Sequence, residues 1–391
     1  MSRFPQYNVN NEHQLIRRQN TYVLGEKLVT IHTEDRDFSQ WKSSNHFEIK
    51  LPETITNVVG LKLMEIELPR NQYVFSNNQQ NTKMQFYLIP NNSTNIPRDL
   101  ALRNRSSKPY EITIQEGTFT PFQMASELQN LMNNLVVQVL LDAGVTGATY
   151  NNFTVYYDKV SQQFYFGNTY DNFKFKFNEQ LFYNVSCNAI VNESQPNNVW
   201  NQYANWGLPS YLGFNKELYV ATDISSNYTF NYDNNIWLIP DTSILPPGTV
   251  PHAYYISSPY PCAIYGDTCI YMEVDKYNTI DELRPYPEAT TQSYNNDYNG
   301  SVNAAFAKIP IFVNSDTQVY ENTKYGYLLN NNNYDPPIDK IRKLKIKFRY
   351  HDGRLVDFKN SNFNFSIMFY HFKDEIARDY VLRVPEQFKM G

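Results

Sequence analysis

The 391-residue sequence has few cysteines, few charged residues and no long apolar run. Its three cysteines, Cys187, Cys262 and Cys269, show no CxxC spacing, which argues against a structural zinc site. The sequence does not decide whether Cys262 and Cys269 form a disulfide, but the odd number of cysteines favours free thiols. No stretch of about 18 apolar residues predicts a membrane-spanning helix, and the polar N-terminus lacks the apolar segment of a signal peptide. We therefore expect folding in a reducing cytoplasm.

Motifs of catalysis and of phosphate binding are also missing. The six histidines form no HExxH pattern, and the chain contains no GxSxG, GxGxxG or GxxxxGK[ST] sequence. A β-sandwich glycosidase, which needs two carboxylates in one groove, has no motif here. The formal net charge of −5 gives no global attraction to nucleic acid. We expect no enzyme, no metal and no cofactor, and no specific nucleic-acid partner.

Aromatic residues and asparagine are abundant instead. Aromatic residues make up 16% of the chain, with 32 Tyr and 25 Phe, whereas charged residues make up 19%. Tyr and Phe favour strands, while Asn and Pro favour turns. The composition therefore predicts a β-rich protein with long ordered loops. Its tyrosine-rich surfaces suit permanent packing against other proteins.

The stretch from Arg36 to Pro69 carries the clearest strand pattern. Residues 46–51 alternate between apolar and charged, and the apolar phase of residues 58–68 reverses near Leu63 and Met64. The reversal predicts a β-bulge or a change of the buried face. Main-body strands are predicted near residues 22–32, 46–51, 58–68, 83–89, 269–275, 304–313, 342–350 and 363–372. Eight antiparallel strands with long connections are typical of a jelly roll, in which two sheets pack face to face.

A helical pattern interrupts these strands. Thr120 suits an N-cap and Pro121 the first helical position. Apolar residues then recur at spacings of three and four from Phe122 to about Leu141, and Gly144 suits the end of the helix. Short strands follow near residues 153–157, 163–166 and 173–177, whereas residues 90–109 read as a polar loop. We therefore expect a mainly β protein, an eight-stranded antiparallel jelly-roll sandwich with an inserted small α/β subdomain carrying one long helix.

These patterns divide the chain into five parts. We expect an N-terminal arm (1–20), the first half of the jelly roll (21–109), the inserted α/β subdomain (110–237), the second half of the jelly roll (238–373) and a C-terminal tail (374–391). In a stand-alone protein the arm would be a frayed end. In an assembly it would be an arm that reaches onto a neighbouring subunit.

Several blocks resemble jelly-roll structural proteins of nucleocytoplasmic large DNA viruses, the giant viruses. RDFSQWKSSNHFEIKLPETITNVVGLKLMEIELP is similar to their N-terminal signature. It is followed in the same order by ITIQEGTFTPFQMASELQNLMN, YLGF, AFAKIPI and LKIKFRYHDGRLVDFKNSNFNFSIMF. The resemblance implies a structural protein of the virion capsid, either a vertex (penton) or a minor capsid protein, made in the host cytoplasm. Its partners would be itself, as a pentamer in the penton version, the major capsid protein and other minor capsid proteins, with an internal membrane nearby.

The candidate site residues are therefore contact residues. Arg36, Asp37 and Trp41 belong to a polar turn whose acidic side chains either bind a cation or hydrogen-bond their own backbone. Lys343, Lys345, Lys347 and Arg349 share one face of a predicted strand. That row suits an acidic partner, a membrane head-group layer or nucleic acid, or is simply a charged face that resists mispairing.

A carbohydrate-binding attachment or fibre protein is the alternative function. Tryptophan and tyrosine rings stack on sugars, and Trp41, Trp200, Trp206 and Trp237 fall mostly in predicted loops. Burial of three of these four side chains would remove the main support for this alternative.

Overall fold

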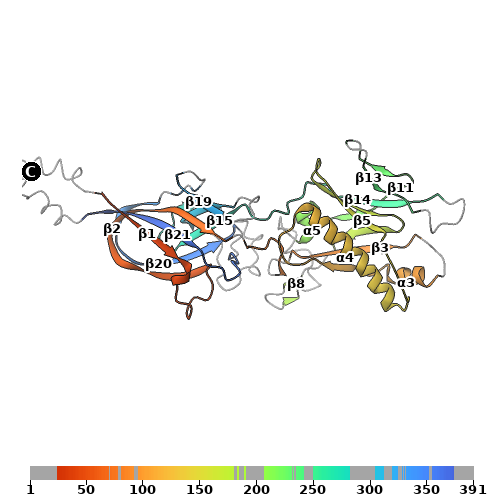
Figure 1. Cartoon of the computed structure of the whole chain (residues 1–391), viewed down its shortest axis with the longest axis horizontal. Helices are drawn as coiled ribbons and strands as arrows, with labels where there is room; N and C mark the ends of the chain where they lie inside the picture. Colours follow the sequence, from red (N-terminus) through yellow and green to blue (C-terminus); the bar gives the residue numbers. More distant parts are fainter. Residues whose placement is uncertain are drawn as a thin grey trace, which may run out of the picture. The chain divides into compact units, whose positions relative to one another are not determined.

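The computed structural model contains two compact units with separate cores (Figure 1). It describes residues 24–69, 71–77, 81–91, 96–179, 183–184, 189–190, 207–230, 232, 235–241, 250–281, 304–311, 319–324, 328, 330, 332–351 and 355–373. Among these, the first unit comprises residues 24–71, 268–281 and 304–373, and the second comprises residues 72–267. The predicted N-terminal arm and C-terminal tail lie outside the described residues.

The first unit is built from antiparallel strands. Its largest sheet has the order β1-β21-β2-β20-β15-β18, and β19 also pairs with β2. Its elements are β1 (Leu24–His32), the 3-10 helix η2 (Thr33–Asp35), β2 (His46–Leu68), β15 (Cys269–Val274), β16 (Ile280–Asp281), β17 (Ala304–Ala305), β18 (Ala307–Pro310), β19 (Val319–Asn322), β20 (Asn332–Arg349) and β21 (Asn364–Phe372).

Strand β2 is long enough to serve two sets of partners. Its N-terminal half, from His46, runs along β20, and its C-terminal half, from Val58, runs along β21 and β19. The β2–β21 register shifts between Leu63 and Glu65, so Leu63 and Ile66 are both fully buried. A bulge inserts one extra residue and thereby reverses the buried phase. The reversal predicted near Leu63–Met64 is therefore confirmed.

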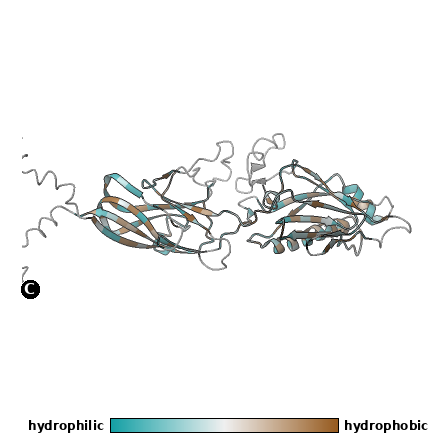
Figure 2. Cartoon of the chain, turned by 90° about the horizontal axis from the view of Figure 1, so that it is seen from above, coloured by the Kyte–Doolittle hydropathy of each residue, from teal (hydrophilic) through white to brown (hydrophobic). Residues whose placement is uncertain are grey.

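One core joins all the main strands of the first unit. Val29 of β1, Ile309 of β18 and Ile346 of β20 belong to the same buried cluster, although β1 and β18 are opposite ends of the sheet order. The sheet therefore wraps around its own core. Figure 2 shows brown and teal alternating along these strands, as expected where one face is buried.

The second unit combines two four-stranded sheets with helices. The sheets have the orders β10-β7-β3-β4 and β11-β14-β6-β5. The elements are β3 (Lys83–Ile89), α3 (Pro97–Arg105), β4 (Tyr110–Thr113), α4 (Pro121–Asp142), β5 (Phe153–Asp158), β6 (Gln163–Asn168), β7 (Asn172–Lys176), β8 (Tyr183–Asn184), β9 (Ala189–Ile190), α5 (Leu208–Tyr211), β10 (Leu218–Val220), β11 (Thr222–Ile224), β12 (Tyr228–Thr229), β13 (Ile236–Leu238) and β14 (Ala253–Ser257).

Helix α4 begins and ends where the sequence predicted. The backbone N–H of Gln123 donates to the Thr120 hydroxyl at 3.3 Å, and the Thr120 N–H donates to the Gln123 side chain at 2.9 Å. This reciprocal capping box satisfies two N–H groups that the first helical turn leaves without partners. Gly144 follows the helix with φ +85°. Phe122, which the spacing assigned to the apolar stripe, is instead 48% exposed.

The mainly β character is confirmed, but several strands belong elsewhere than predicted. The segments 46–51 and 58–68 form one strand, β2, and β19 lies between the predicted strands 304–313 and 342–350, where no strand was predicted. The 83–89 segment, expected in the jelly roll, is β3 of the second unit, because it pairs with β4 and β7. Alternation identifies a strand but does not identify its partner.

The second unit is also wider than the predicted insertion of residues 110–237. It starts at residue 72 and extends to residue 267, since β14 pairs with β6 and β11. The predicted polar loop 90–109 contains helix α3. Only Asp99 and Leu102 are buried on α3, so its sequence shows too few apolar residues for a helical period.

Candidate interaction surface

Arg36 holds together the turn that follows β1. It is 5% exposed, and its guanidinium donates to the carbonyls of Thr33 at 2.6 Å, Trp41 at 3.0 Å and Lys42 at 3.1 Å, and to Asn362 Oδ1 at 2.7 Å. Burial lowers the pKa of Arg36. The predicted contact residue is thus a buried clamp within its own unit.

Asp37 and Trp41 lie on the outside of the same turn. The Asp37 carboxylate accepts the Ser39 N–H at 2.9 Å and the Ser39 hydroxyl at 2.6 Å, and these bonds lower the pKa of Asp37. Such bonds are what a turn stabilised by its own aspartate requires. Trp41 is half-buried, with its ring edge-on to His46 at 4.8 Å. The exposed carboxylate of Asp37 therefore lies beside the partly exposed indole of Trp41.

All four residues of the basic row lie on β20, and the two at its ends form ion pairs with carboxylates of neighbouring strands. Lys343 forms an ion pair with Glu48 at 2.9 Å, and Lys345 lies over the Trp41 ring at 5.8 Å. Arg349 is 1% exposed and forms an ion pair with Glu273 at 3.3 Å. Only the Lys343 end is well exposed, so the row is not the open cationic strip that the sequence pattern suggested.

His46 is a residue of this surface that the sequence analysis missed. It lies opposite Lys347 in the β2–β20 register and is 4% exposed. Burial, and then the charges of Lys347, Lys345 and Arg349, lower the pKa of His46 to about 4. Burial also lowers the pKa of Lys347. The alternation of β2 marked a strand there, but only the register shows that His46 faces cations.

A groove of about 420 Å³ adjoins the turn. One side is formed by Val29–Ile31 of β1 and the other by Glu48–Pro52 of β2, with Asp35, Asp37, Gln40 and Trp41 also lining it. The structure therefore brings Asp37 and Trp41 together at a concave surface. Lys345, Lys347 and Arg349 are not among the residues that line it.

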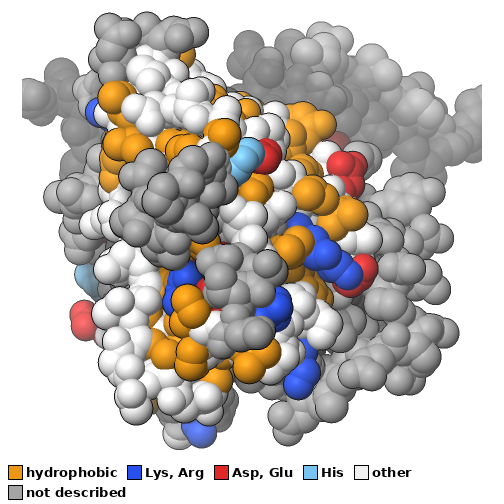
Figure 3. Space-filling view, turned by 90° about the vertical axis from the view of Figure 1, so that its right-hand side faces the viewer, with side chains coloured by type: hydrophobic (Ala, Val, Ile, Leu, Met, Phe, Trp, Pro, Cys, Tyr) orange, Lys and Arg blue, Asp and Glu red, His pale blue; other side chains and the backbone are white. Residues whose placement is uncertain are grey.

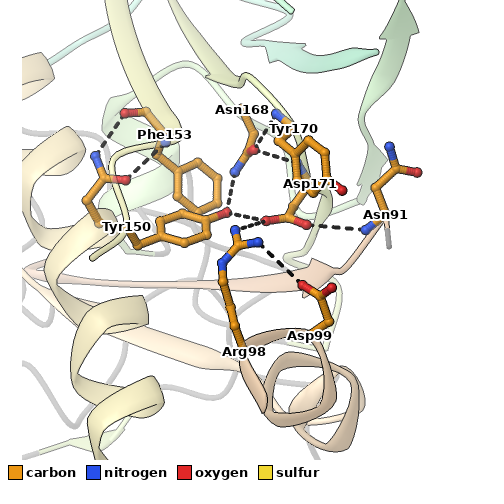
Figure 4. A network of polar contacts seen from close by, with 9 residues as sticks. Asn91, Arg98, Asp99, Tyr150, Phe153, Asn168, Tyr170 and Asp171 are labelled. Atoms are coloured by element: carbon orange, nitrogen blue, oxygen red, sulfur yellow. Dashed lines mark hydrogen bonds and ion pairs between the residues drawn. The ribbon is translucent and has the colours of Figure 1, made fainter. Parts of the chain in front are cut away.

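The second unit contains a buried polar network around Asp171 (Figure 4). The Asp171 carboxylate accepts the Tyr150 hydroxyl at 3.0 Å, the Asn91 N–H at 3.2 Å and the Arg98 guanidinium at 3.4 Å. Asn168 donates to the Tyr150 oxygen at 2.8 Å. Burial raises the pKa of Asp171, although Arg98 opposes the shift. Because Arg98 lies on α3, the network anchors that helix to the sheet.

Apolar side chains are exposed on both units. Figure 3, which looks onto the second unit, shows its apolar side chains in several groups, with Lys and Arg side chains among them. Those of the first unit are Leu24, Leu28, Phe38 and Tyr320, and those of the second include Ile96, Leu100, Phe122, Val160, Leu218, Val220, Tyr232, Ile236, Ile239 and Val250. Gathered exposed apolar residues are typical of surfaces that bind other macromolecules.

The described residues contain no group of three His, Cys, Asp or Glu side chains placed to hold a metal ion. No helix among them is long and apolar enough to cross a membrane. Cys262 and Cys269 are free thiols, as the cysteine count favoured, whereas Cys187 lies outside the described residues. The expectation that the chain is not an enzyme stays a prediction.

Comparisons with known proteins find solved structures only. No family model matches the sequence, and no curated protein matches it. The mavirus penton protein aligns with 90% of this chain and 99% of its own, at 9% identity and a TM-score of 0.37. A structure of the Sputnik virophage determined by cryo-EM at 3.5 Å aligns with 91% of this chain and 99% of its own, at 11% identity and a TM-score of 0.35. Both TM-scores lie below 0.5, so the functional assignment rests on this chain's own residues and geometry.

Proposed function

We propose that the chain is a structural virion protein, a capsid vertex (penton) or minor capsid protein that assembles with itself and with the major capsid protein. It would act by association rather than by chemistry, through large preformed surfaces. In the penton version, five copies surround a vertex. Closed symmetry then makes a stable ring from modest single contacts.

The observation that carries this proposal is the strand order of the first unit. We interpret it as a jelly roll of two four-stranded sheets. One sheet is β1, β21, the C-terminal half of β2 and β19, and the other is the N-terminal half of β2, β20, β15 and β18. The second unit is then an insertion between β2 and β15, larger than the predicted subdomain. Two such sheets around one core define the jelly-roll architecture, which occurs in viral capsid proteins.

The blocks that resemble giant-virus capsid proteins support the same proposal. Block 36–69 forms the Arg36 turn and β2, and block 112–133 spans the end of β4 and most of α4. Block 305–311 includes β18, and block 344–369 contains parts of β20 and β21. These segments supply buried residues to the two cores, so the resemblance lies in the framework of each unit.

Self-association tests the proposal directly. We expect the purified full-length chain to form an oligomer, with a mass about five times the 45.9 kDa of one chain in the penton version. Analytical ultracentrifugation over a range of concentrations measures that mass. A cryo-EM map of the virus particle then shows whether the chain lies at the five-fold axis or beneath the facets. A chain that stays monomeric and is absent from purified particles would overturn the proposal.

The carbohydrate-binding alternative gains no specific support. Trp237 is half-buried, and three tyrosines lie 5.6 to 6.4 Å from it at steep angles, Tyr165, Tyr228 and Tyr255. A Cβ at Gly167 would lie 2.9 Å from the Trp237 ring, so the indole packs directly on the sheet. Trp41 packs against His46. Trp200 and Trp206 lie outside the described residues, so the burial test covers two of the four side chains.

A further inference from the structure

We propose that the groove beside Trp41 binds the N-terminal arm, residues 1–20, of a second copy of this chain. This inference rests on the proposed self-assembly and assigns one contact within it. Neither the basic row nor the polar network of the second unit is needed for it.

The groove is bordered by the backbone edges of two strands. Three consecutive residues of β1, Val29–Ile31, and five of β2, Glu48–Pro52, line it. Consecutive residues point to opposite faces, so the strand edge rather than one face borders the space. Within the described residues, β1 pairs only with β21, and this half of β2 pairs only with β20. Each strand therefore has one edge to which an extended segment can add by backbone hydrogen bonds.

The two ends of the groove differ. An ion pair between Lys27 and Glu53 joins β1 to β2 at one end. Exposed Asp35 and Asp37 lie at the other end, where the turn also places Trp41. An extended segment that enters from the aspartate end would place a cationic side chain by Asp35 and Asp37. An apolar neighbour would then contact the indole.

Charge selects the N-terminal arm rather than the C-terminal tail as this segment. Residues 1–20 contain three arginines against one glutamate, whereas residues 374–391 contain three basic and four acidic residues. In the arm, Leu15 and Ile16 come directly before Arg17 and Arg18. The arm therefore offers both the apolar and the cationic side chains that the groove requires. Opposite charges at such a contact add mainly specificity.

The length of the arm favours a second copy over the same chain. Leu24 to His32 of β1 spans about 26 Å at about 3.3 Å per residue, and Asp35 lies beyond His32. The six residues from Arg18 to Leu24 reach at most about 21 Å when fully extended. The arm would also have to reverse its direction at Leu24 to run back along β1. Arg17 and Arg18 are therefore poorly placed to reach the aspartates of their own chain.

Cysteine cross-linking between two full-length proteins tests the contact. One protein carries Arg18→Cys and the other Asp37→Cys, and the two have different affinity tags. Mild oxidation of the mixture is expected to give a disulfide-linked heterodimer, with the linked peptides identified by mass spectrometry. Asp35→Cys serves as a second variant in case Asp37→Cys loosens the turn. Asp339→Cys on β20, which is exposed and does not line the groove, is the matched control, and unsubstituted chains report links through native cysteines.

Charge exchange tests the chemistry of the contact. Adding Arg17→Glu to the Arg18→Cys protein should lower the heterodimer yield by at least about fivefold, because like charges then meet at the groove. Adding Asp35→Lys to the Asp37→Cys partner should restore most of that yield. If Arg17→Glu lowered the heterodimer yield only by unfolding its own protein, Asp35→Lys in the partner would not restore that yield.

The outcomes separate this inference from the proposed function. Equal yield at Asp339→Cys, or a link formed only within one chain that carries both cysteines, would overturn the arm contact while the oligomer mass stands. Preferential linkage of Asp37→Cys to Arg383→Cys in the tail would overturn the assignment of the occupant. A chain that stays monomeric at 45.9 kDa would instead contradict self-assembly itself.

Discussion

At the residue scale, His46 couples the first unit to pH. Its imidazole is 4% exposed and packs edge-on against Trp41, on the face that also carries Lys345 and Lys347. Burial and these positive charges both disfavour the imidazolium form. The pKa of His46 is therefore about 4 in the folded state, against 6.5 as the ordinary value.

The depressed pKa of His46 predicts acid sensitivity of the first unit. Between pH 6.5 and about 4 the unfolded chain binds a proton at this position that the folded chain does not. The free energy of unfolding should therefore fall with decreasing pH in that window, by on the order of 2 kcal/mol from this group. Urea unfolding at pH 7 and pH 4.5 measures the difference. His46→Gln should reduce the difference and His32→Gln, at an exposed position of β1, should retain it; equal pH dependence in both would contradict the assignment.

In the second unit, Asp171 is the central acceptor of the buried polar network. Asp171→Ala removes the acceptor of Tyr150, Asn91 and Arg98 within a buried site. Loss of one member of such a network leaves the others without their partner, which costs about 2 to 4 kcal/mol. Chemical denaturation of the second unit measures this loss. Asp142→Ala, at an exposed position of α4, should change stability by less than about 0.5 kcal/mol, and a similar effect of both variants would refute the role of the network.

At the scale of elements, the turn after α5 depends on glycine. Gly213 has φ +89°, and a Cβ there would lie 2.1 Å from the Tyr260 carbonyl oxygen. Gly213→Ala therefore combines backbone strain with a clash against backbone, and we expect a loss of at least about 3 kcal/mol. Gly147 has φ +67° but open space around it. Gly147→Ala should cost only about 1 kcal/mol, and equal losses in denaturation experiments would argue against the close approach of Tyr260.

Local sequence patterns predicted some helices and strands of this protein and missed others. Helix α4 has its cap, its apolar spacing and its terminal glycine within one continuous segment, so its bounds followed from sequence. Strands β5, β6 and β7 alternate clearly and were also predicted. Strand β19 has only four residues and is recognised by its pairing with β2. Helix α3 is largely polar because most of it faces solvent.

At the scale of the whole molecule, the two units have separate cores. Phe365 is fully buried in the core of the first unit, and Phe175 in that of the second. Phe→Ala at such positions costs about 3 to 5 kcal/mol. We expect Phe365→Ala and Phe175→Ala each to increase amide hydrogen exchange within its own unit, with the other variant as control. Equal loss of protection in both units from either variant would show that they unfold as one.

The sequence by itself determined the local features of this protein: its β-rich character, the capped helix α4, the phase reversal in β2 and the absence of familiar catalytic motifs. These depend on residue preferences and on periods within short segments. Only the tertiary structure decided which strands are partners, because alternation is the same whichever sheet a strand joins. Glu273 and Arg349 are 76 residues apart, and Arg98 and Asp171 are 73 apart. Folding therefore buried one end of the predicted cationic row in the Arg349–Glu273 ion pair and placed Asp37 and Trp41 beside a groove.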